Sequence, residues 1–224
     1  ERVRALAPNS AVMAVVKANA YGHGVEALKP ALEQADQLAV IDIAEAQTLR
    51  QLGLQQSITL LQGVNSAAEL QLCQTQQFIP AICNPSQLAL LVNLAMEQGL
   101  EAAPAFCLKL DTGMHRLGLN QAELADALAA LKQASLSGPY RCMSHFACAD
   151  DSAEFTQQQI QQFDVLIEGL PLASQSLANS AAIVDYPDSH RDLVRPGIML
   201  YGATPFPDRD AAALDLKPVM SLQA

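Results

Sequence analysis

Short apolar or β-branched runs recur along this chain at intervals of about twenty to thirty-five residues. Runs of this length, bounded by polar or turn residues, are typical of buried β-strands. The pattern predicts strands at 12–17, 38–43, 58–62, 78–83, 105–110, 141–146, 176–180 and 195–200.

Most of the segments between these strands have apolar positions at helical spacing. The spacing predicts helices at 44–52, 66–74, 85–98, 121–132 and 156–168. Residues that commonly cap helix starts precede three of them, namely Asn65, Asn84 and Asn120. Gly53 and Gly99 lie where two of the helices should end.

Strands that alternate with helices indicate parallel pairing through right-handed crossovers. Eight such units favour a closed (β/α)8 TIM-type barrel over an open doubly wound sheet. The sequence contains no G-x-G-x-x-G or P-loop pattern. We therefore predict a parallel α/β barrel with its chemistry at the carboxyl ends of the strands.

The two ends of the chain predict a fragment. Residues 1–5 resemble the end of a helix, and the chain starts at Glu1 instead of methionine. Residues 218–224 form an apolar, strand-like run that stops abruptly. We expect the barrel to cover 1–217, truncated at its N-terminus, and a further domain, missing here, to start at 218–224.

Composition and charge argue against some classes of function. The chain has 224 residues, half of them hydrophobic, and a net charge of −10, which disfavours a nucleic-acid partner. No apolar run reaches membrane-spanning length and no signal peptide opens the sequence. The five cysteines form no C-x-x-C pair, so we expect reduced, mostly buried thiols in a cytoplasmic protein.

The strongest chemical signal is the segment 15–24, VVKANAYGHG. An apolar strand ends in Lys17, and a turn with Tyr21, Gly22 and Gly24 follows. An amine at a strand end can act as a nucleophile, and free backbone N–H groups with a hydroxyl can hold a phosphate. Together they suggest pyridoxal 5′-phosphate (PLP). A surface lysine that ends an edge strand is the alternative.

Five segments in order resemble the alanine racemases. They are KANAYGHG at 17–24, KLDTGMHRLG at 109–118, SHFA at 144–147, NSAA at 179–182 and VRPGIMLYG at 194–202. The resemblance covers nearly the whole chain and implies that the barrel over 1–217 is PLP-dependent and PLP-binding and that 218–224 is the start of a missing C-terminal β-rich domain. Another PLP barrel, such as an amino-acid decarboxylase or a non-catalytic PLP-binding barrel, remains the alternative.

The resemblance implies a role for each matching residue. Lys17 would carry PLP as a Schiff base and act as a catalytic base on the substrate. The remaining cofactor contacts would come from Tyr21, His145, Asn179, Ser180, Arg195, Gly197 and Ile198. Arg195 would face the pyridine nitrogen, and because arginine can only donate, that nitrogen would stay unprotonated. From the residues alone, Asn179 could equally be a helix cap, and His145 a buried structural histidine.

Two further residues concern the substrate. Arg116 resembles the arginine that binds the substrate carboxylate. Lys109 matches a lysine that is carbamylated in the family, although an unmodified Lys109 paired with Asp111 is also reasonable. Cys148 and Asp150 follow His145 without a regular metal-ligand spacing, so we predict no metal.

Minor histidine roles are also predicted. His23 should support local structure, and His190 should lie at the surface. His115 departs from the glycine found in many members of the family, which leaves the loop before Arg116 open.

Racemisation needs proton transfer on both faces of the substrate carbon, and the chain provides one base, Lys17. In alanine racemases a tyrosine from the second domain of a partner subunit provides the other. None of the four tyrosines, Tyr21, Tyr140, Tyr186 and Tyr201, matches it. The resemblance implies a homodimeric parent that interconverts L- and D-alanine for bacterial peptidoglycan. We expect little activity from this chain alone, and a racemase of another amino acid is the nearest alternative.

Overall fold

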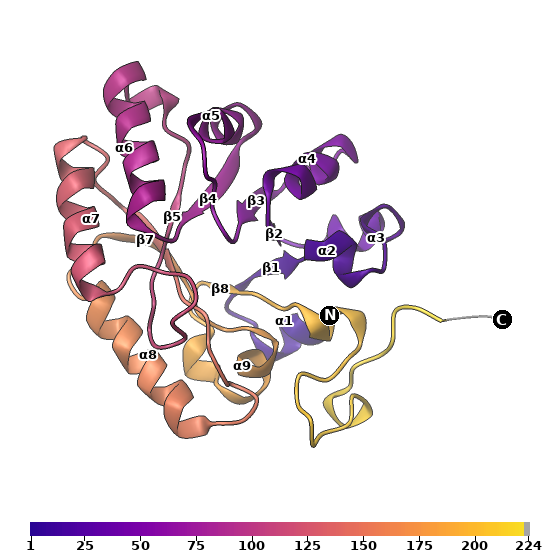
Figure 1. The fold of residues 1–224 in the computed structure, drawn as a ribbon. Helices are drawn as coiled ribbons and strands as arrows, with labels where there is room; N and C mark the ends of the chain where they lie inside the picture. The colour runs from indigo at the N-terminus through magenta and orange to yellow at the C-terminus, as the bar shows by residue number, and fades with distance from the viewer. Residues whose placement is uncertain (222–224) are drawn as a thin grey trace.

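Eight parallel strands form the centre of the molecule in the computed structural model, which describes residues 1–221 (Figure 1). The strands are β1 Ala11–Val15, β2 Gln37–Val40, β3 Ser57–Leu60, β4 Phe78–Ile82, β5 Cys107–Lys109, β6 Tyr140–Met143, β7 Leu172–Ser176 and β8 Leu193–Val194. Their order is β7-β6-β5-β4-β3-β2-β1-β8, so each strand lies beside its neighbours in sequence and β8 returns to β1. The predicted TIM-type barrel is confirmed.

The seam between β7 and β8 is held differently from the other strand pairs. The Ser176 hydroxyl donates to the Leu193 carbonyl over 2.6 Å, and the Arg195 N–H donates to the Ala178 carbonyl over 2.8 Å. The Gln175 N–H donates to the Asp192 carboxylate over 2.8 Å. The barrel is therefore nearly closed, through contacts that do not follow a regular ladder.

Helices surround the strands on the outside (Figure 1). They are α1 Arg2–Leu6, α2 Lys17–Tyr21, α3 Val25–Leu32, α4 Ile43–Gln51, α5 Ala67–Gln76, α6 Pro85–Gln98, α7 Gln121–Gln133, α8 Ala153–Ile167 and α9 Ser180–Asp185. Short 3-10 turns lie at Leu100–Ala102, Pro187–Ser189, Ile198–Tyr201 and Ala212–Leu214. The five predicted helices are confirmed within a few residues.

Two predicted strands and one predicted cap are wrong. The predicted strand 176–180 begins where β7 ends, because Asn179 caps α9 and turns the chain. The predicted strand 195–200 follows β8 and is a turn leading into the 3-10 helix Ile198–Tyr201. The cap of α5 is Ser66, whose hydroxyl accepts from the Glu69 N–H.

Alternation along the strands produces two packed layers. One face of each strand packs against the helices in a large apolar cluster that includes Leu38, Ile58 and Phe78. The other face fills the barrel interior with smaller clusters, which contain Met13, Val15, Ala39 and Leu193, and Ile79, Cys107 and Met143. Lys109 follows Cys107 by two residues, so the period of two places it on the interior face as well.

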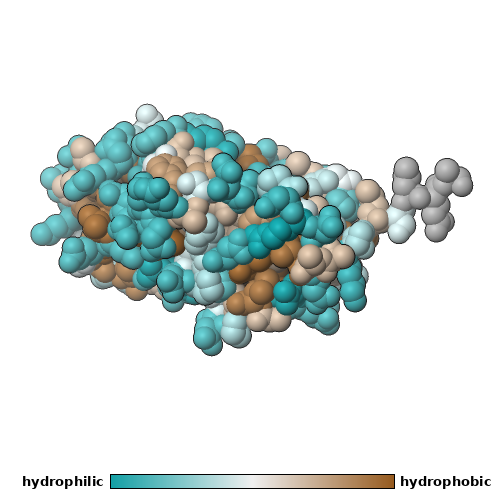
Figure 2. Space-filling view, turned by 90° about the horizontal axis from the view of Figure 1, so that it is seen from below, coloured by the Kyte–Doolittle hydropathy of each residue, from teal (hydrophilic) through white to brown (hydrophobic). Residues whose placement is uncertain are grey.

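The remaining predictions about the chain can be checked on residues 1–221. Cys73, Cys83, Cys107 and Cys142 are buried and unpaired, as expected, and Cys148 is partly buried. Residues 218–221 form neither helix nor strand, while 222–224 lie outside the described residues, so the strand expected there is not seen. Within the part of the chain that is described, none of the helices is both long and apolar enough to cross a membrane. Figure 2 shows hydrophilic side chains over one face, with hydrophobic patches between them.

Candidate active site

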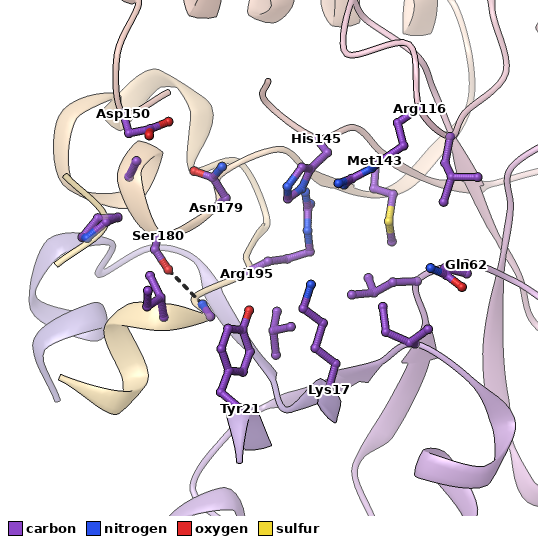
Figure 3. Close-up of a pocket in the computed structure, with 18 of the residues that line it drawn as sticks. Lys17, Tyr21, Gln62, Arg116, Met143, His145, Asp150, Asn179, Ser180 and Arg195 are labelled. Atoms are coloured by element: carbon purple, nitrogen blue, oxygen red, sulfur yellow. Dashed lines mark hydrogen bonds between the residues drawn. The ribbon is translucent and has the colours of Figure 1, made fainter. Parts of the chain in front are cut away.

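A cavity of about 630 Å³ opens at the carboxyl ends of the strands (Figure 3). All ten residues predicted for the site line it: Lys17, Tyr21, Lys109, Arg116, His145, Asn179, Ser180, Arg195, Gly197 and Ile198. Because they come from five widely separated segments, only the closed strand order brings them together. Their individual roles remain predictions.

The sequence reasoning missed several lining residues. They are Val15, Ile41, Leu61, Gln62, Leu117, Met143, Asp150, Ala181, Thr204 and Pro205. Five of these, at positions 15, 41, 61, 62 and 143, lie at or just after the end of a strand. Strand position alone could have identified those five, because a barrel places its strand ends around one opening.

Lys17 is followed by an unusual backbone turn. The φ angles of Ala18, Asn19, Ala20 and Tyr21 are 52°, 51°, 56° and 55°, so four consecutive non-glycine residues are left-handed. Such a conformation costs about 1–2 kcal/mol per residue and requires support from its surroundings. The turn directs the Lys17 amine and the Tyr21 hydroxyl into the cavity (Figure 3). The Lys17 Nζ lies 5.8 Å from the centre of the Tyr21 ring.

Aromatic stacking supports the same turn. The Tyr21 and His23 rings lie 4.9 Å and 4.6 Å from the Tyr201 ring, whose hydroxyl donates to the Val15 carbonyl. His23 thus has the local structural role that was predicted. A Cβ on Gly197 would lie 2.6 Å from the Tyr21 hydroxyl oxygen, so a glycine there makes room for Tyr21.

Polar groups gather where β7 turns into α9. The Asn179 side chain caps the helix by accepting from the Ala182 N–H over 3.1 Å. The buried Ser180 hydroxyl accepts from the Gly197 N–H over 2.9 Å and from the Met199 N–H over 3.4 Å. The hydroxyl and the N–H predicted to hold a phosphate therefore already contact each other at one edge of the cavity (Figure 3).

Arg195 is almost fully buried below the cavity floor. Its guanidinium donates to the Ser176 carbonyl and hydroxyl, each over 2.7 Å, and to the Leu177 and Ser144 carbonyls. Burial lowers the pKa of Arg195 to about 10, so the side chain is still protonated at neutral pH. The arginine thus binds the ends of β6 and β7 together while it lies against the cavity.

Lys109 has no acidic partner among the described residues. Its amine is buried and donates to the Leu61 carbonyl over 3.0 Å, and burial lowers its pKa. The alternative of a Lys109–Asp111 pair is wrong, because Asp111 accepts instead from the Gly113 and His115 N–H groups and from the His115 ring. The His115 ring is exposed and its backbone is left-handed, which settles the loop before Arg116.

The cavity is strongly electropositive. Lys17, Lys109, Arg116 and Arg195 line it, against the single carboxylate of Asp150. Among residues 1–221, Arg116 makes no hydrogen bond or ion pair with another side chain, and it reaches toward His145 (Figure 3). A cavity with this charge balance is suited to a ligand with several negative charges.

The positive charges around the cavity also affect the pKa of His145. Burial, followed by the charges of Arg195, Lys109, Arg116 and Lys17, lowers its pKa to about 3. The imidazole is therefore neutral at neutral pH. The buried Gln159 holds this segment from α8, since it donates to the His145 carbonyl over 3.2 Å and accepts from the Ala147 N–H over 2.9 Å.

The lowered pKa of His145 makes stability depend on pH. Between pH 6.5 and 3 the unfolded chain binds the proton that the folded chain excludes, so stability falls as the pH falls. The free energy of unfolding should fall by at most about 2 kcal/mol between pH 7 and pH 5, since each pH unit below 6.5 costs about 1.4 kcal/mol. The value is an upper limit because the ring is only partly screened from solvent. Urea unfolding at both pH values should show a smaller loss in His145→Asn. Equal losses in the two proteins would contradict the assignment.

His190 does not lie at the surface as predicted. It is buried, with one ring nitrogen 3.0 Å from the Ile183 carbonyl. The polar stretch around it gave no sign that α9 packs over this ring.

Among the described residues, no cluster of three or more His, Cys, Asp or Glu is placed to bind a metal.

The geometry defines a class: a parallel (β/α)8 barrel whose carboxyl-end cavity holds a lysine from the first strand among several cations. Comparison with known proteins gives the family. The chain belongs to the family described as alanine racemase, N-terminal domain, which matches residues 1–205.

The similar proteins are longer than this chain. An alanine racemase of Thioalkalivibrio sulfidiphilus is 44% identical over 99% of this chain and 61% of its own length. The structure of alanine racemase from Acinetobacter baumannii is 39% identical with a TM-score of 0.87, over 97% of this chain and 60% of that one. A histidine racemase from Leuconostoc mesenteroides subsp. sake is 25% identical with a TM-score of 0.79, over 89% of this chain and 55% of that one. The chain spans about 60% of the length of the relatives it matches.

Proposed function

We propose that this chain is the cofactor-binding barrel of a PLP-dependent alanine racemase that works in the bacterial cytoplasm and supplies D-alanine for peptidoglycan. The observation that carries the proposal is the set of ten residues that line one electropositive cavity. A non-catalytic PLP-binding barrel would need Lys17 and the phosphate site but not Arg116, so the presence of Arg116 and Lys109 beside Lys17 and Arg195 favours the enzyme.

The donor set fits PLP. The aldehyde of PLP reacts with an amine, its phosphate accepts hydrogen bonds from N–H and hydroxyl groups, and its ring nitrogen pairs with a polar side chain. Lys17 offers the amine, and Tyr21 and Ser180 lie at one edge of the cavity with hydroxyl groups available. When bound, the cofactor supplies an electron-accepting ring that stabilises negative charge on the substrate carbon.

The residues of the chain divide the remaining work. Tyr21, Asn179, Ser180, Gly197 and Ile198 would hold the phosphate. Arg195 would donate to the ring nitrogen and keep it unprotonated, because a guanidinium cannot accept. This weakens the ring as an electron acceptor and favours return of the proton to the substrate carbon.

The substrate would be oriented by two other side chains. Arg116, which has no partner among the described residues, would bind the carboxylate through its planar fork. His145 would pack beside the cofactor ring in its neutral form. The Lys17 amine would take the proton from one face of the substrate carbon in one direction of the reaction and would deliver a proton to that same face in the reverse direction.

We propose that Lys109 is carbamylated. Burial lowers the pKa of the Lys109 amine and so favours its neutral form, and a neutral amine can add to carbon dioxide to form a carbamate with release of one proton. The carbamate would place a negative charge between Arg116 and Arg195. Native mass spectrometry should detect one bound carbon dioxide that is lost in Lys109→Gln; a wild-type chain that carries no added mass would refute it.

A second base is needed on the opposite face. Tyr21 alone among the four tyrosines lines the cavity, on the same turn as Lys17. We propose that the second base belongs to a segment beyond this chain, contributed across a homodimer of the longer protein. A racemase of another amino acid is the second candidate, favoured by the likeness to the histidine racemase.

The test is borohydride reduction of the chain mixed with PLP, followed by peptide mass mapping. We expect one cofactor adduct on Lys17, none there in Lys17→Ala, and little alanine racemisation by this chain alone. Labels spread over surface lysines would refute the cofactor site. Robust turnover by the chain alone would refute the need for a second subunit.

A further inference from the structure

Two neighbouring helices of the barrel begin in the same way. Glu45 in α4 and Glu69 in α5 each occupy the third helical position. Each carboxylate accepts an N–H from the residue that precedes its helix cap, Ile41 over 2.8 Å and Asn65 over 2.7 Å. The arrangement resembles a capping box, except that the donated N–H lies one residue before the helix cap.

The second oxygen distinguishes the two glutamates. The Glu45 Oε1 accepts from the Ala18 N–H over 2.6 Å, across 27 residues of sequence. Within residues 1–221, the Glu69 carboxylate makes no such contact outside its own helix start. Glu45 therefore joins the end of β2 to the residue directly after Lys17.

The contact lies at the start of the left-handed turn. Further along, the Ala20 N–H donates to Val16 and the Gly22 N–H to Ala18, both over 2.9 Å. The partner of the Ala18 N–H is the Glu45 carboxylate. Without it, the first residue of a strained backbone would lose its anchor, and relaxation toward the ordinary right-handed region would swing Lys17 and Tyr21 away from the cavity.

We propose that Glu45 is a positioning residue for Lys17. It touches neither the cavity nor the reacting atoms, and it acts by fixing the backbone that aims the amine. A hydrogen bond to a charged acceptor is stronger than a neutral one, which suits an anchor on a strained turn. The inference rests on the proposed reaction of Lys17 with PLP.

The matched pair Glu45→Gln and Glu69→Gln tests it. At either site a glutamine keeps one acceptor oxygen and loses the charge, so both helix starts are weakened alike. At position 69 that one oxygen can still accept from Asn65. At position 45 two N–H groups need an acceptor, so the NH2 group of the glutamine must face one of them. At limiting PLP we expect Lys17 labelling to fall about tenfold or more in E45Q and to stay at the wild-type level in E69Q. Without PLP, amide hydrogen exchange across 17–24 should quicken by a similar factor in E45Q only.

The outcomes separate this inference from the proposed function. If the wild-type chain fails to label at Lys17, the cofactor proposal fails, and the exchange measurement still decides whether Glu45 anchors the turn. Equal exchange and equal labelling in E45Q and E69Q would overturn the role of Glu45. If E45Q does not fold, Glu45→Asp, which keeps the charge on a shorter side chain, replaces it in both measurements with the same expected direction.

Discussion

Replacing Arg195 with methionine should lower the free energy of unfolding by about 4 kcal/mol and abolish PLP labelling of Lys17. The guanidinium is the shared donor for the carbonyls of Ser144, Ser176 and Leu177, and methionine would leave all three without it in a buried place. The cost exceeds that of one hydrogen bond because the same contacts close the seam beside β7 and β8. Urea unfolding monitored by circular dichroism would measure it.

A second arginine that bonds backbone carbonyls is the control. Arg50 donates to the Leu54 and Gln56 carbonyls over 2.6 Å and 2.9 Å, and also to Gln76, at the opposite end of the barrel. Arg50→Met should cost about 2 kcal/mol and leave Lys17 labelling unchanged, since it is far from the cavity and partly exposed. An R195M chain that unfolds at the wild-type urea concentration would show that the seam does not depend on the guanidinium.

The position of the site follows from the sequence because the fold rule is strong. Once Lys17, Lys109 and His145 are placed at or after carboxyl ends of parallel strands, barrel closure brings them to one opening. The period of two then turns Lys109 inward with Cys107. Local propensity and global arrangement agree at these positions, so pattern reasoning succeeds.

The errors have specific physical causes. β8 has only two residues, too few to show alternation, and the apolar residues after Pro196 pack as a turn. Asp111 resembles a partner for Lys109 in sequence, but two backbone N–H groups and a histidine outcompete the lysine.

The left-handed turn was also invisible in the sequence. Alanines carry no sign of a positive φ, and the Ala18 N–H donates to Glu45 in the first turn of α4, a contact that no local pattern encodes. Its support comes from tertiary contacts, which sequence spacing does not report.

Gly63→Ala is the second substitution for which we expect a large loss, about 4 kcal/mol or failure to fold. Gly63 has a φ of +74°, and a Cβ there would lie 2.2 Å from the Ala81 carbonyl oxygen and 2.8 Å from the Gln87 amide. Neither neighbour can yield easily, because Ala81 belongs to β4 and the buried Gln87 bonds the Gln62 carbonyl and the Cys83 N–H, each over 2.8 Å.

Gly169→Ala separates the clash from the backbone strain. Gly169 has a φ of +75°, close to that of Gly63, but a Cβ added there would meet no atom within 4 Å, so the substitution should cost only about 1–2 kcal/mol. The difference between the two variants is the contribution of close packing beside β3. Because the Leu61 carbonyl, two residues before Gly63, accepts from the Lys109 amine, a folded G63A chain should also disturb that hydrogen bond. Thermal unfolding of the pair would measure the difference, and equal losses would mean that the loop after β3 moves freely enough to absorb the methyl group.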